Sequence, residues 1–289
     1  MLLATLVGAD LSPADLRVAS DALAAIGSLP QHWRWIDAGL AADLPFEGGD
    51  IATARATLEA ALPHLDIIVQ STAAPRRKQL IIADMDSTMI TVECIDELAD
   101  YAGIKPQIAA ITEAAMRGDL DFVAALDARV SLLKGMDAAV IDQCRAERVR
   151  LMPGARTLVQ TMRGNGARTI LVSGGFTAFA APVAAEIGFA RAVANVLEIA
   201  DGRLTGKVAR PVVDSATKLA ELDASGVARG AVLAVGDGAN DIPMIAAAGL
   251  GIAYHAKPKT AAAAQAAVRH GDLTVLLHAQ GYARADWVG

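Results

Sequence analysis

A short apolar run that ends in two carboxylates constrains this chain more than any other feature. Residues 80–83 read Leu-Ile-Ile-Ala, and Asp84 and Asp86 follow with one residue between them. Such a run is typical of a buried strand, and in open α/β sheets ligands bind at the carboxyl ends of the strands. Two acids there are costly unless a cation or a proton compensates them. The structural alternative is that Asp84 caps a following helix and Asp86 faces water.

Two later apolar runs also end in polar clusters. Residues 169–172 precede Ser-Gly-Gly at 173–175, and residues 231–235 precede Gly-Asp-Gly-Ala-Asn-Asp at 236–241. Helical patterns separate these runs, which predicts an α/β fold with a doubly wound parallel sheet. Right-handed crossovers bring the carboxyl ends of parallel strands to one edge. We therefore expect the polar clusters to converge, joined by Lys218 from a helix between the last two.

The chemistry of the converging groups indicates a phosphoryl-transfer site. Several carboxylates within a few ångströms cannot all ionise unless a cation lies among them. Oxygen ligands without nearby histidine or cysteine favour Mg²⁺. A lysine, Mg²⁺ and glycine amides are what a phosphoryl group requires, because its charge spreads over three oxygens. The side chains expected to converge are Asp84, Asp86, Ser173, Lys218, Asp237 and Asp241.

The remaining segments predict a small domain and a helical insertion. Residues 1–72 read as strands near 2–7, 32–36 and 65–70 with two helices between them, a small α+β unit without a chemical constellation. Residues 73–79 contain a proline and three basic residues, which suggests a linker with solvated charges.

Residues 80–289 should then form the core. Residues 92–150 carry only helical patterns, so we expect a helical cap inserted directly behind the first core strand. Asp201-Gly202 between two strand-like runs, 193–199 and 203–208, indicates a hairpin. Further strands are expected at 251–254 and 273–277.

Composition limits the partners and the location. A net charge of −6 over 289 residues argues against a general nucleic-acid binder. Cys94 and Cys144 show no zinc spacing and no disulfide framework, so we expect reduced core cysteines in a cytoplasmic protein. No run approaches the roughly 20 apolar residues of a membrane span, and Met1–Ala9 lacks the basic start of a signal peptide. Open edges in the small N-terminal sheet favour a homodimer.

The motifs together resemble the haloacid dehalogenase (HAD) superfamily. The matching residues are Asp84-x-Asp86-x-Thr88, Ser173, Lys218 and Gly236-Asp237-Gly238-x-Asn240-Asp241. Within the superfamily, Asp-Met-Asp-Ser-Thr at 84–88 and Ser-Gly-Gly-Phe at 173–176 resemble the phosphoserine phosphatase family. The resemblance covers about residues 78–285 and implies a HAD-like Rossmannoid core with a helical cap. Residues 1–72 are similar in outline to the ACT-like domain of longer members.

This resemblance implies hydrolysis of O-phosphoserine to serine and phosphate, the last step of serine biosynthesis. Asp84 would be the nucleophile that forms an aspartyl-phosphate, and Asp86 the general acid and base. The family pattern places Asp84, the main-chain carbonyl of Asp86 and Asp237 around Mg²⁺, with Asp241 nearby. The residues implied to hold the phosphoryl group, or to orient its ligands, are Ser173, Gly174, Lys218 and Asn240.

The resemblance also implies how the cap selects a substrate that carries one ammonium and one carboxylate. Glu93 would take the ammonium and Arg129 the carboxylate, the latter in bidentate geometry. Met116 and Phe122 fall where the family has its apolar cap lining, although both could equally be core residues between cap helices. Glu93 could instead be a solvated acid at a helix start, and Arg129 a plain salt-bridging residue.

Two other functions are compatible with the same residues. The aspartyl-phosphate could pass its phosphoryl group to another alcohol such as homoserine, which phosphate release with and without that alcohol would reveal. Alternatively, the N-terminal unit could sense an amino acid while the phosphatase fold serves only as a scaffold. The intact pair Asp84 and Asp86 argues against the second alternative.

Overall fold

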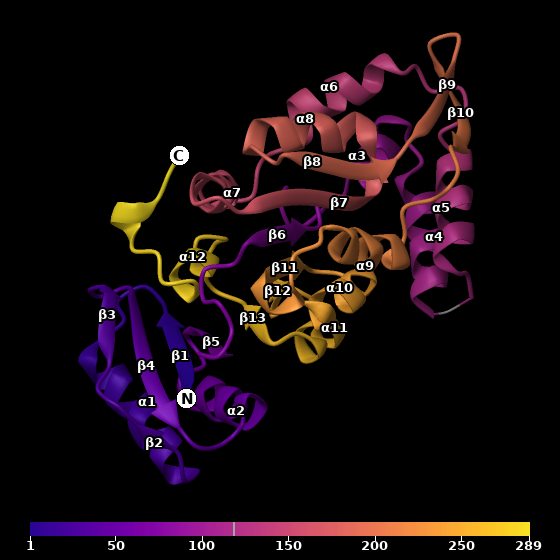
Figure 1. Cartoon of the computed structure of the whole chain (residues 1–289). Helices are drawn as coiled ribbons and strands as arrows, with labels where there is room; N and C mark the ends of the chain where they lie inside the picture. The colour runs from indigo at the N-terminus through magenta and orange to yellow at the C-terminus, as the bar shows by residue number, and fades with distance from the viewer. Residues whose placement is uncertain (118) are drawn as a thin grey trace.

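The central sheet of the chain is six-stranded and entirely parallel (Figure 1). The computed structural model describes residues 1–117 and 119–289, without the side chains of residues 116 and 117. The strand order is β13–β12–β11–β6–β7–β8. The strands are β6 (Leu80–Ala83), β7 (Arg168–Phe176), β8 (Arg191–Asn195), β11 (Val232–Gly236), β12 (Leu250–Tyr254) and β13 (Ala266–Val268). The central position of β6 places Asp84 in the middle of the carboxyl edge.

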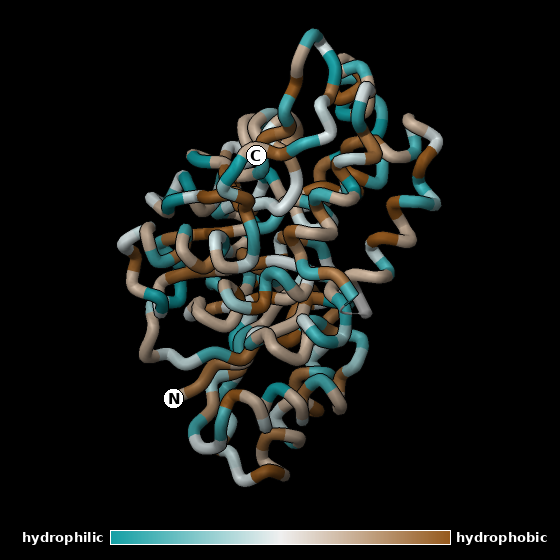
Figure 2. The backbone as a smooth tube through the Cα atoms, turned by 90° about the vertical axis from the view of Figure 1, so that its right-hand side faces the viewer, coloured by the Kyte–Doolittle hydropathy of each residue, from teal (hydrophilic) through white to brown (hydrophobic). Residues whose placement is uncertain are grey.

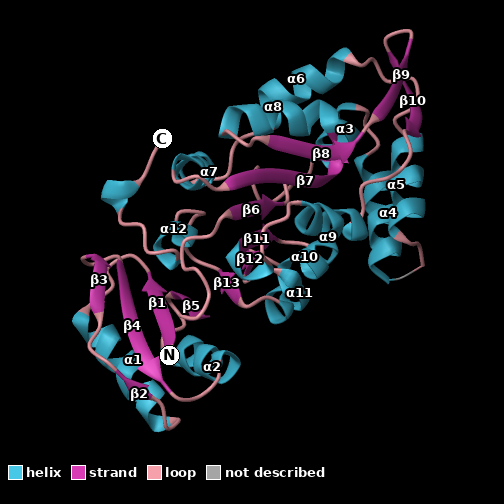
Figure 3. Cartoon of the chain, in the orientation of Figure 1, coloured by secondary structure: helices cyan, strands magenta, loops and turns pink. Residues whose placement is uncertain are grey.

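Helices cover both faces of this sheet (Figure 3). One face packs against α7 (Ala155–Gly164) and α8 (Thr177–Ile187), through a cluster that includes Ile81 and Ala83. The other packs against α9 (Ser215–Ala224) and α10 (Ile242–Ala247), through a cluster that includes Leu80 and Ile82. All four residues of β6 are buried because alternate side chains enter opposite layers. The predicted doubly wound sheet is confirmed.

The cap consists of four helices inserted between β6 and α7. They are α3 (Cys94–Tyr101), α4 (Lys105–Arg117), α5 (Phe122–Ser131) and α6 (Ala139–Arg148). The chain leaves and re-enters the core side by side, because Thr91 N–H donates to the Arg150 carbonyl and Met152 N–H donates to the Met89 carbonyl. The cap is therefore attached to the core through one paired crossing.

A hairpin from the core braces the cap. It comprises β9 (Leu197–Ala200) and β10 (Arg203–Val208), and the φ values of Asp201 (49°) and Gly202 (74°) suit the expected turn. Residues 193–195 of the run predicted at 193–199 belong instead to β8. The Gly135 N–H donates to the Leu204 carbonyl, and the Leu204 N–H donates to the Met136 carbonyl. The tip is hydrophilic and stands at the top of Figure 2.

The N-terminal sheet contains more strands than the sequence predicted. The elements are β1 (Leu2–Val7), α1 (Pro13–Ala25), β2 (Leu29–Pro30), β3 (Arg34–Asp37), β4 (Ala41–Glu47), α2 (Ile51–Ala61) and β5 (Asp66–Ser71). The antiparallel order is β2–β4–β1–β5, and β3 also pairs with β4. β4 was not predicted, and Pro45 within it is unusual for a strand that is paired on both sides. The result is a split βαβ arrangement, and its relation to ACT domains stays a prediction.

The strand predicted at 273–277 is wrong. This segment leads into the short helix α12 (Val275–Ala279), and the edge strand of the core is β13 instead. Asp272 starts the turn by accepting the Thr274 N–H. The run is buried between the core and the N-terminal sheet, and an apolar run alone does not distinguish a buried helix from a buried strand. The remaining helices are α11 (Pro258–Ala263) and three 3₁₀ turns, η1 (Arg229–Ala231), η2 (Ala239–Asp241) and η3 (Arg284–Asp286).

The charges at residues 76–78 were expected to be solvated. This is wrong for Arg76 and Lys78, whose charged groups bind other parts of the protein. The Arg76 guanidinium binds both Asp43 carboxylate oxygens at 2.7 Å and donates to the carbonyls of His278 and Ala279. Lys78 is buried, and its ammonium donates to the carbonyls of Pro75 and Gly230. Arg76 therefore joins the N-terminal sheet to α12, which lies between that sheet and the core (Figure 1). Only Arg77 is exposed.

None of the described helices combines the length and the apolarity needed to cross a membrane. Cys94 and Cys144 are both free and buried.

Candidate active site

Asp84 occupies the position that the sequence predicted, directly beyond β6. Its backbone N–H continues the sheet ladder by donating to the Val235 carbonyl at 3.0 Å. Its side chain is nearly enclosed, with 6% of the residue exposed. The carboxylate oxygen Oδ1 accepts the Met85 N–H at 2.7 Å and lies 2.8 Å from the Lys218 ammonium. Asp84 does not cap a helix, so the structural alternative fails for this residue.

Lys218 is a fully buried ammonium held between two acids. It projects from the first turn of α9, which Asp214 caps by accepting the Thr217 N–H at 2.8 Å. Its Nζ atom lies 2.8 Å from Asp84 Oδ1 and 2.6 Å from Asp241 Oδ1. Burial favours the neutral amine, but the two carboxylates outweigh it and hold the pKa of Lys218 above its ordinary value.

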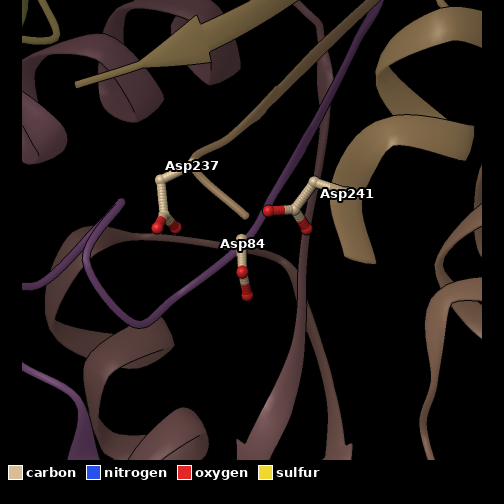
Figure 4. Close-up of side chains that lie close together, drawn as sticks. All are labelled: Asp84, Asp237 and Asp241. Carbon is tan, nitrogen blue, oxygen red and sulfur yellow. The ribbon is translucent and has the colours of Figure 1, made fainter. Parts of the chain in front are cut away.

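Asp84, Asp237 and Asp241 form a carboxylate cluster (Figure 4). One oxygen of each lies within 4.8 Å of the others. Burial and the charge of Asp241 raise the pKa of Asp84 well above its ordinary value, and the same two effects raise the pKa of Asp237 to about 6. Three carboxylates beside one ammonium leave negative charge uncompensated, and every donor is oxygen. The cluster is consistent with a divalent metal ion.

Backbone and hydroxyl groups fix the shape of this cluster. The Thr88 hydroxyl donates to Asp237 at 3.1 Å, and the Gly238 N–H donates to Asp241 Oδ2 at 3.0 Å. A Cβ atom at Gly236 would lie 2.4 Å from the Asp241 carboxylate. Position 236 therefore requires glycine so that β11 can pass close to the acid.

Asp86 lies in a different environment from Asp84. Its Oδ1 accepts the N–H of Cys94, the first residue of α3, at 3.1 Å, and its Oδ2 lies 3.4 Å from the Ser173 hydroxyl. Burial and the nearby charge of Glu93 raise the pKa of Asp86 to about 7, against the opposing effect of the Cys94 N–H. Asp86 is thus half-buried and contacts a helix start, rather than simply facing water.

The carboxyl end of β7, residues 173–175, lies beside the carboxylates. Ser173 is buried, and its oxygen accepts the Gly175 N–H at 2.8 Å. A Cβ atom at Gly175 would come within 2.6 Å of Asp86 Oδ2, so a side chain there would displace the acid. The structure therefore brings Asp84, Asp86, Ser173 and Lys218 to one edge, as predicted.

The two cap residues predicted to bind substrate face the same region. The Ser87 hydroxyl donates to Glu93 Oε1 at 2.8 Å. The described hydrogen bond of the Arg129 guanidinium runs from Nε to the Ala125 carbonyl, which leaves its terminal nitrogens available. Burial lowers the pKa of Arg129, and the charges of Asp96, Glu93 and Asp86 oppose this. No ion pair of Arg129 is found among the described residues, and its binding of a substrate carboxylate stays a prediction.

Phe122 lies against the carboxyl end of β7. A Cβ atom at Gly174 would be 3.2 Å from Phe122 Cζ, so the start of α5 closes onto residues 173–175. The side chain of Met116 lies outside the described residues.

Known proteins share this arrangement. The sequence pattern of haloacid dehalogenase-like hydrolases matches residues 81–246. The chain belongs to this family. It is 46% identical over 241 residues to a phosphoserine phosphatase of Streptomyces coelicolor, covering 82% of this chain and 58% of that one. It is 45% identical over 223 residues to a phosphoserine phosphatase of Polaromonas sp., covering 73% and 94%.

A solved structure extends the likeness across nearly the whole chain. The unliganded probable phosphoserine phosphatase of Vibrio cholerae superposes with a TM-score of 0.79 and 36% identity, covering 99% of this chain and 88% of that one. The chain spans less than two thirds of the length of the Streptomyces relative.

The structure differs from the expected residue set of this HAD hydrolase at two asparagines. Lys218 is held by Asp84 and Asp241, and no described hydrogen bond joins it to Asn240, whose amide oxygen lies beside Gly238. Asn195, at the end of β8, was missed. It is buried, donates to the Gly174 carbonyl at 2.8 Å and accepts the Val213 N–H at 2.7 Å. The predicted run 193–199 continues past Asn195, so the residue pattern did not indicate that a strand ends there.

Proposed function

We propose that this hydrolase converts O-phosphoserine and water to serine and phosphate. The observation that carries the proposal is the pair of opposite charges, Glu93 and Arg129, close to the acid centre and attached to the cap. A phosphoserine molecule presents an ammonium and a carboxylate beside its ester, so it would satisfy both. The names of the relatives from Streptomyces and Polaromonas support the same substrate.

Asp84 is the proposed nucleophile. Among the described contacts its Oδ1 has protein partners, which leaves Oδ2 for the attack on phosphorus. A phosphorus–oxygen bond to Asp84 forms as the bond to the seryl oxygen breaks. Water then attacks the aspartyl-phosphate, which releases phosphate and restores the carboxylate.

Asp86 is the proposed general acid and base. Its pKa of about 7 lets it hold a proton near neutral pH, and it donates this proton to the departing seryl oxygen. The resulting carboxylate takes a proton from the attacking water in the second step. Ser173, the Gly174 N–H and Lys218 would hold the phosphoryl oxygens and stabilise their charge.

The metal ion proposed for this centre is Mg²⁺, held by Asp84, the Asp86 carbonyl and Asp237, with Asp241 nearby. The all-oxygen donor set and the raised pKa values of Asp84 and Asp237 support this assignment. When bound, Mg²⁺ supplies positive charge that offsets the repulsion between the Asp84 carboxylate and the phosphate dianion.

The matching relatives do not support the alternative of phosphoryl transfer to another alcohol, since they are named phosphatases. The intact Asp84 and Asp86 argue against a scaffold without activity. A cytoplasmic location, the homodimer and an effector role for residues 1–72 stay predictions.

Phosphate release from O-phosphoserine by the purified chain with Mg²⁺ tests the proposal directly. The Asp84→Asn variant keeps the shape of the side chain but lacks the nucleophilic carboxylate, so we expect a loss of about 10³-fold or more in kcat. Circular dichroism would confirm that this variant folds. Appreciable turnover by a folded Asp84→Asn variant would refute the covalent mechanism.

A further inference from the structure

Glu93 is held by a neighbour whose role the reaction scheme does not explain. The Ser87 hydroxyl donates to Glu93 Oε1 at 2.8 Å. Ser87 lies in the tight turn after β6, where its N–H donates to the Val92 carbonyl. The two residues therefore stand at opposite ends of one short loop, and the hydroxyl joins these ends.

The Glu93 carboxylate forms no hydrogen bond with the backbone of α3, the helix that follows it. Glu93 is the N-cap residue of α3, but its side chain accepts no hydrogen bond from the helix. The N–H of Cys94 goes to Asp86 instead. Glu93 is also exposed, and an exposed glutamate without a partner samples many rotamers. The bond from Ser87 fixes the carboxylate before any ligand arrives.

The backbone of Ser87 is a second, independent observation. Its φ is 54°, in the left-handed region that glycine occupies without strain. The other non-glycine residues with positive φ in the described chain are Asp10, Asp201 and His255. Aspartate and histidine are enriched in this region, whereas serine is not. A serine here accepts backbone strain and contributes a hydroxyl that glycine would lack.

We propose that Ser87 is a positioning residue that orients Glu93 toward the ammonium group of the substrate. This inference rests on the proposed function, because it assigns a cation to Glu93. Ser87 would then set the preference for phosphate esters that carry a positive charge. It acts through Glu93 and does not touch the reacting atoms.

The preference is measured with two matched esters, phosphoethanolamine and n-propyl phosphate, which differ by an ammonium in place of a methyl group. The readout is the ratio of their kcat/KM values, with KM and kcat resolved separately. We expect Ser87→Ala to lower this ratio about tenfold, mainly through KM, because a hydrogen bond to a charged group is lost. Ser87→Gly should lower it by a similar factor, although it relieves the backbone strain.

Two further variants separate the proposed role from general damage. Thr91→Ala removes a hydroxyl from the same loop that faces the Arg150 carbonyl, and it should keep the ratio of the wild type. In a Glu93→Gln background, Ser87→Ala should change the ratio less than twofold, because the side chain at position 93 that Ser87 contacts is already neutral. A full tenfold change in that background, or a wild-type ratio for Ser87→Gly, would overturn the proposal.

The proposed function is judged by a separate measurement. If the wild type favours phosphoethanolamine over n-propyl phosphate but does not hydrolyse O-phosphoserine, the proposed substrate fails and the role of Ser87 is still decided by the variants. If the wild type shows no preference between the two esters, Glu93 is not an ammonium site and the inference about Ser87 fails.

Discussion

Two aspartates separated by one residue lie in different environments within the same loop. Asp84 contacts the Lys218 ammonium, whereas Asp86 contacts a backbone N–H and a serine hydroxyl. Both are removed from water, but the lysine ammonium compensates only Asp84 directly. This difference supports the proposed roles, attack on phosphorus by Asp84 and proton transfer by Asp86.

The pKa of Asp86 predicts the pH dependence of the reaction. The acid form donates the proton, and its fraction falls as the pH rises through about 7. We therefore expect kcat/KM for O-phosphoserine to fall about tenfold per pH unit well above 7. p-Nitrophenyl phosphate has a leaving group that needs no proton, so its pH profile should lack this decline. Identical profiles for the two substrates would remove Asp86 from the acid role.

The carboxylate cluster predicts how the stability of the folded chain responds to pH. Asp237 ionises at about 6 in the fold but near 3.9 when unfolded. The folded state thus holds an extra proton between these values, and stability is lost as the pH rises through this window. Mg²⁺ at the proposed site would bind the ionised cluster of the folded state, so we expect it to restore stability, by about 2.7 kcal/mol at 100 times its Kd.

Thermal unfolding with EDTA and with Mg²⁺ at pH 7.5, about 1.5 units above the pKa of Asp237, tests this expectation. The Asp237→Asn variant should lose most of the shift caused by Mg²⁺. Asp142→Asn is a matched control, because its carboxylate lies on the exposed surface of α6. A full Mg²⁺ shift in Asp237→Asn would place the ion elsewhere.

At the scale of elements, the hairpin β9–β10 is one contact through which the core supports the cap. Its backbone bonds to residues 135–138, and Arg210 beyond it pairs with Asp127 of α5, the helix that carries Arg129. The hairpin also continues toward α9, which carries Lys218. One segment therefore connects the residue that would bind the substrate carboxylate with the residue that would bind phosphate.

Two glycines of β10 and its turn test this connection. Both Gly202 and Gly206 have positive φ, so alanine costs about 1–2 kcal/mol of backbone strain at either. Only at Gly206 would a Cβ atom meet the cap, 2.9 Å from Lys134 Cβ, whereas nothing lies within 4 Å at Gly202. Gly206→Ala should therefore raise the KM for O-phosphoserine several-fold more than Gly202→Ala, because α5 shifts. Equal KM values in steady-state assays would show that the hairpin does not position the cap.

At the scale of the whole molecule, polar contacts join the N-terminal sheet to the core. One face of that sheet carries Thr5, Asp43 and Gln70, all of them buried. Gln70 donates to the Ala279 carbonyl, and Arg76 binds Asp43 and the same end of α12. On the neighbouring edge, Asp66 accepts the backbone N–H groups of residues 269–271. Polar groups of the N-terminal sheet are therefore hydrogen-bonded to groups of the core, as they would be within one domain.

Arg76 is the residue whose loss should separate the two parts. Arg76→Ala leaves the buried Asp43 carboxylate without its cation, so we expect the free energy of unfolding to fall by about 2–4 kcal/mol. Arg77→Ala is the control, because its side chain is exposed. Urea unfolding followed by tryptophan fluorescence and by circular dichroism measures the effect. A change below 1 kcal/mol, equal to that of Arg77→Ala, would contradict a joining role.

The sequence by itself determined the chemistry of the centre. Apolar runs that end in Asp84, Ser173 and Asp237 are local features, and parallel topology alone brings such ends to one edge. The doubly wound sheet, the helical cap and the turn at Asp201-Gly202 follow from patterns within a few residues. Hydrophobic periodicity and turn chemistry carry that information because they depend on neighbours in the chain.

Only the tertiary structure decided the features that depend on distant partners. Residues 275–277 of the run predicted as a strand are helical at a contact between two sheets. β4 is a strand despite Pro45 because β1 and β3 flank it, and Arg76 is held because Asp43 faces it. Asn195 and the bond from Ser87 to Glu93 were invisible for the same reason. A polar side chain reveals its role only through its partner, and folding, not sequence proximity, chooses that partner.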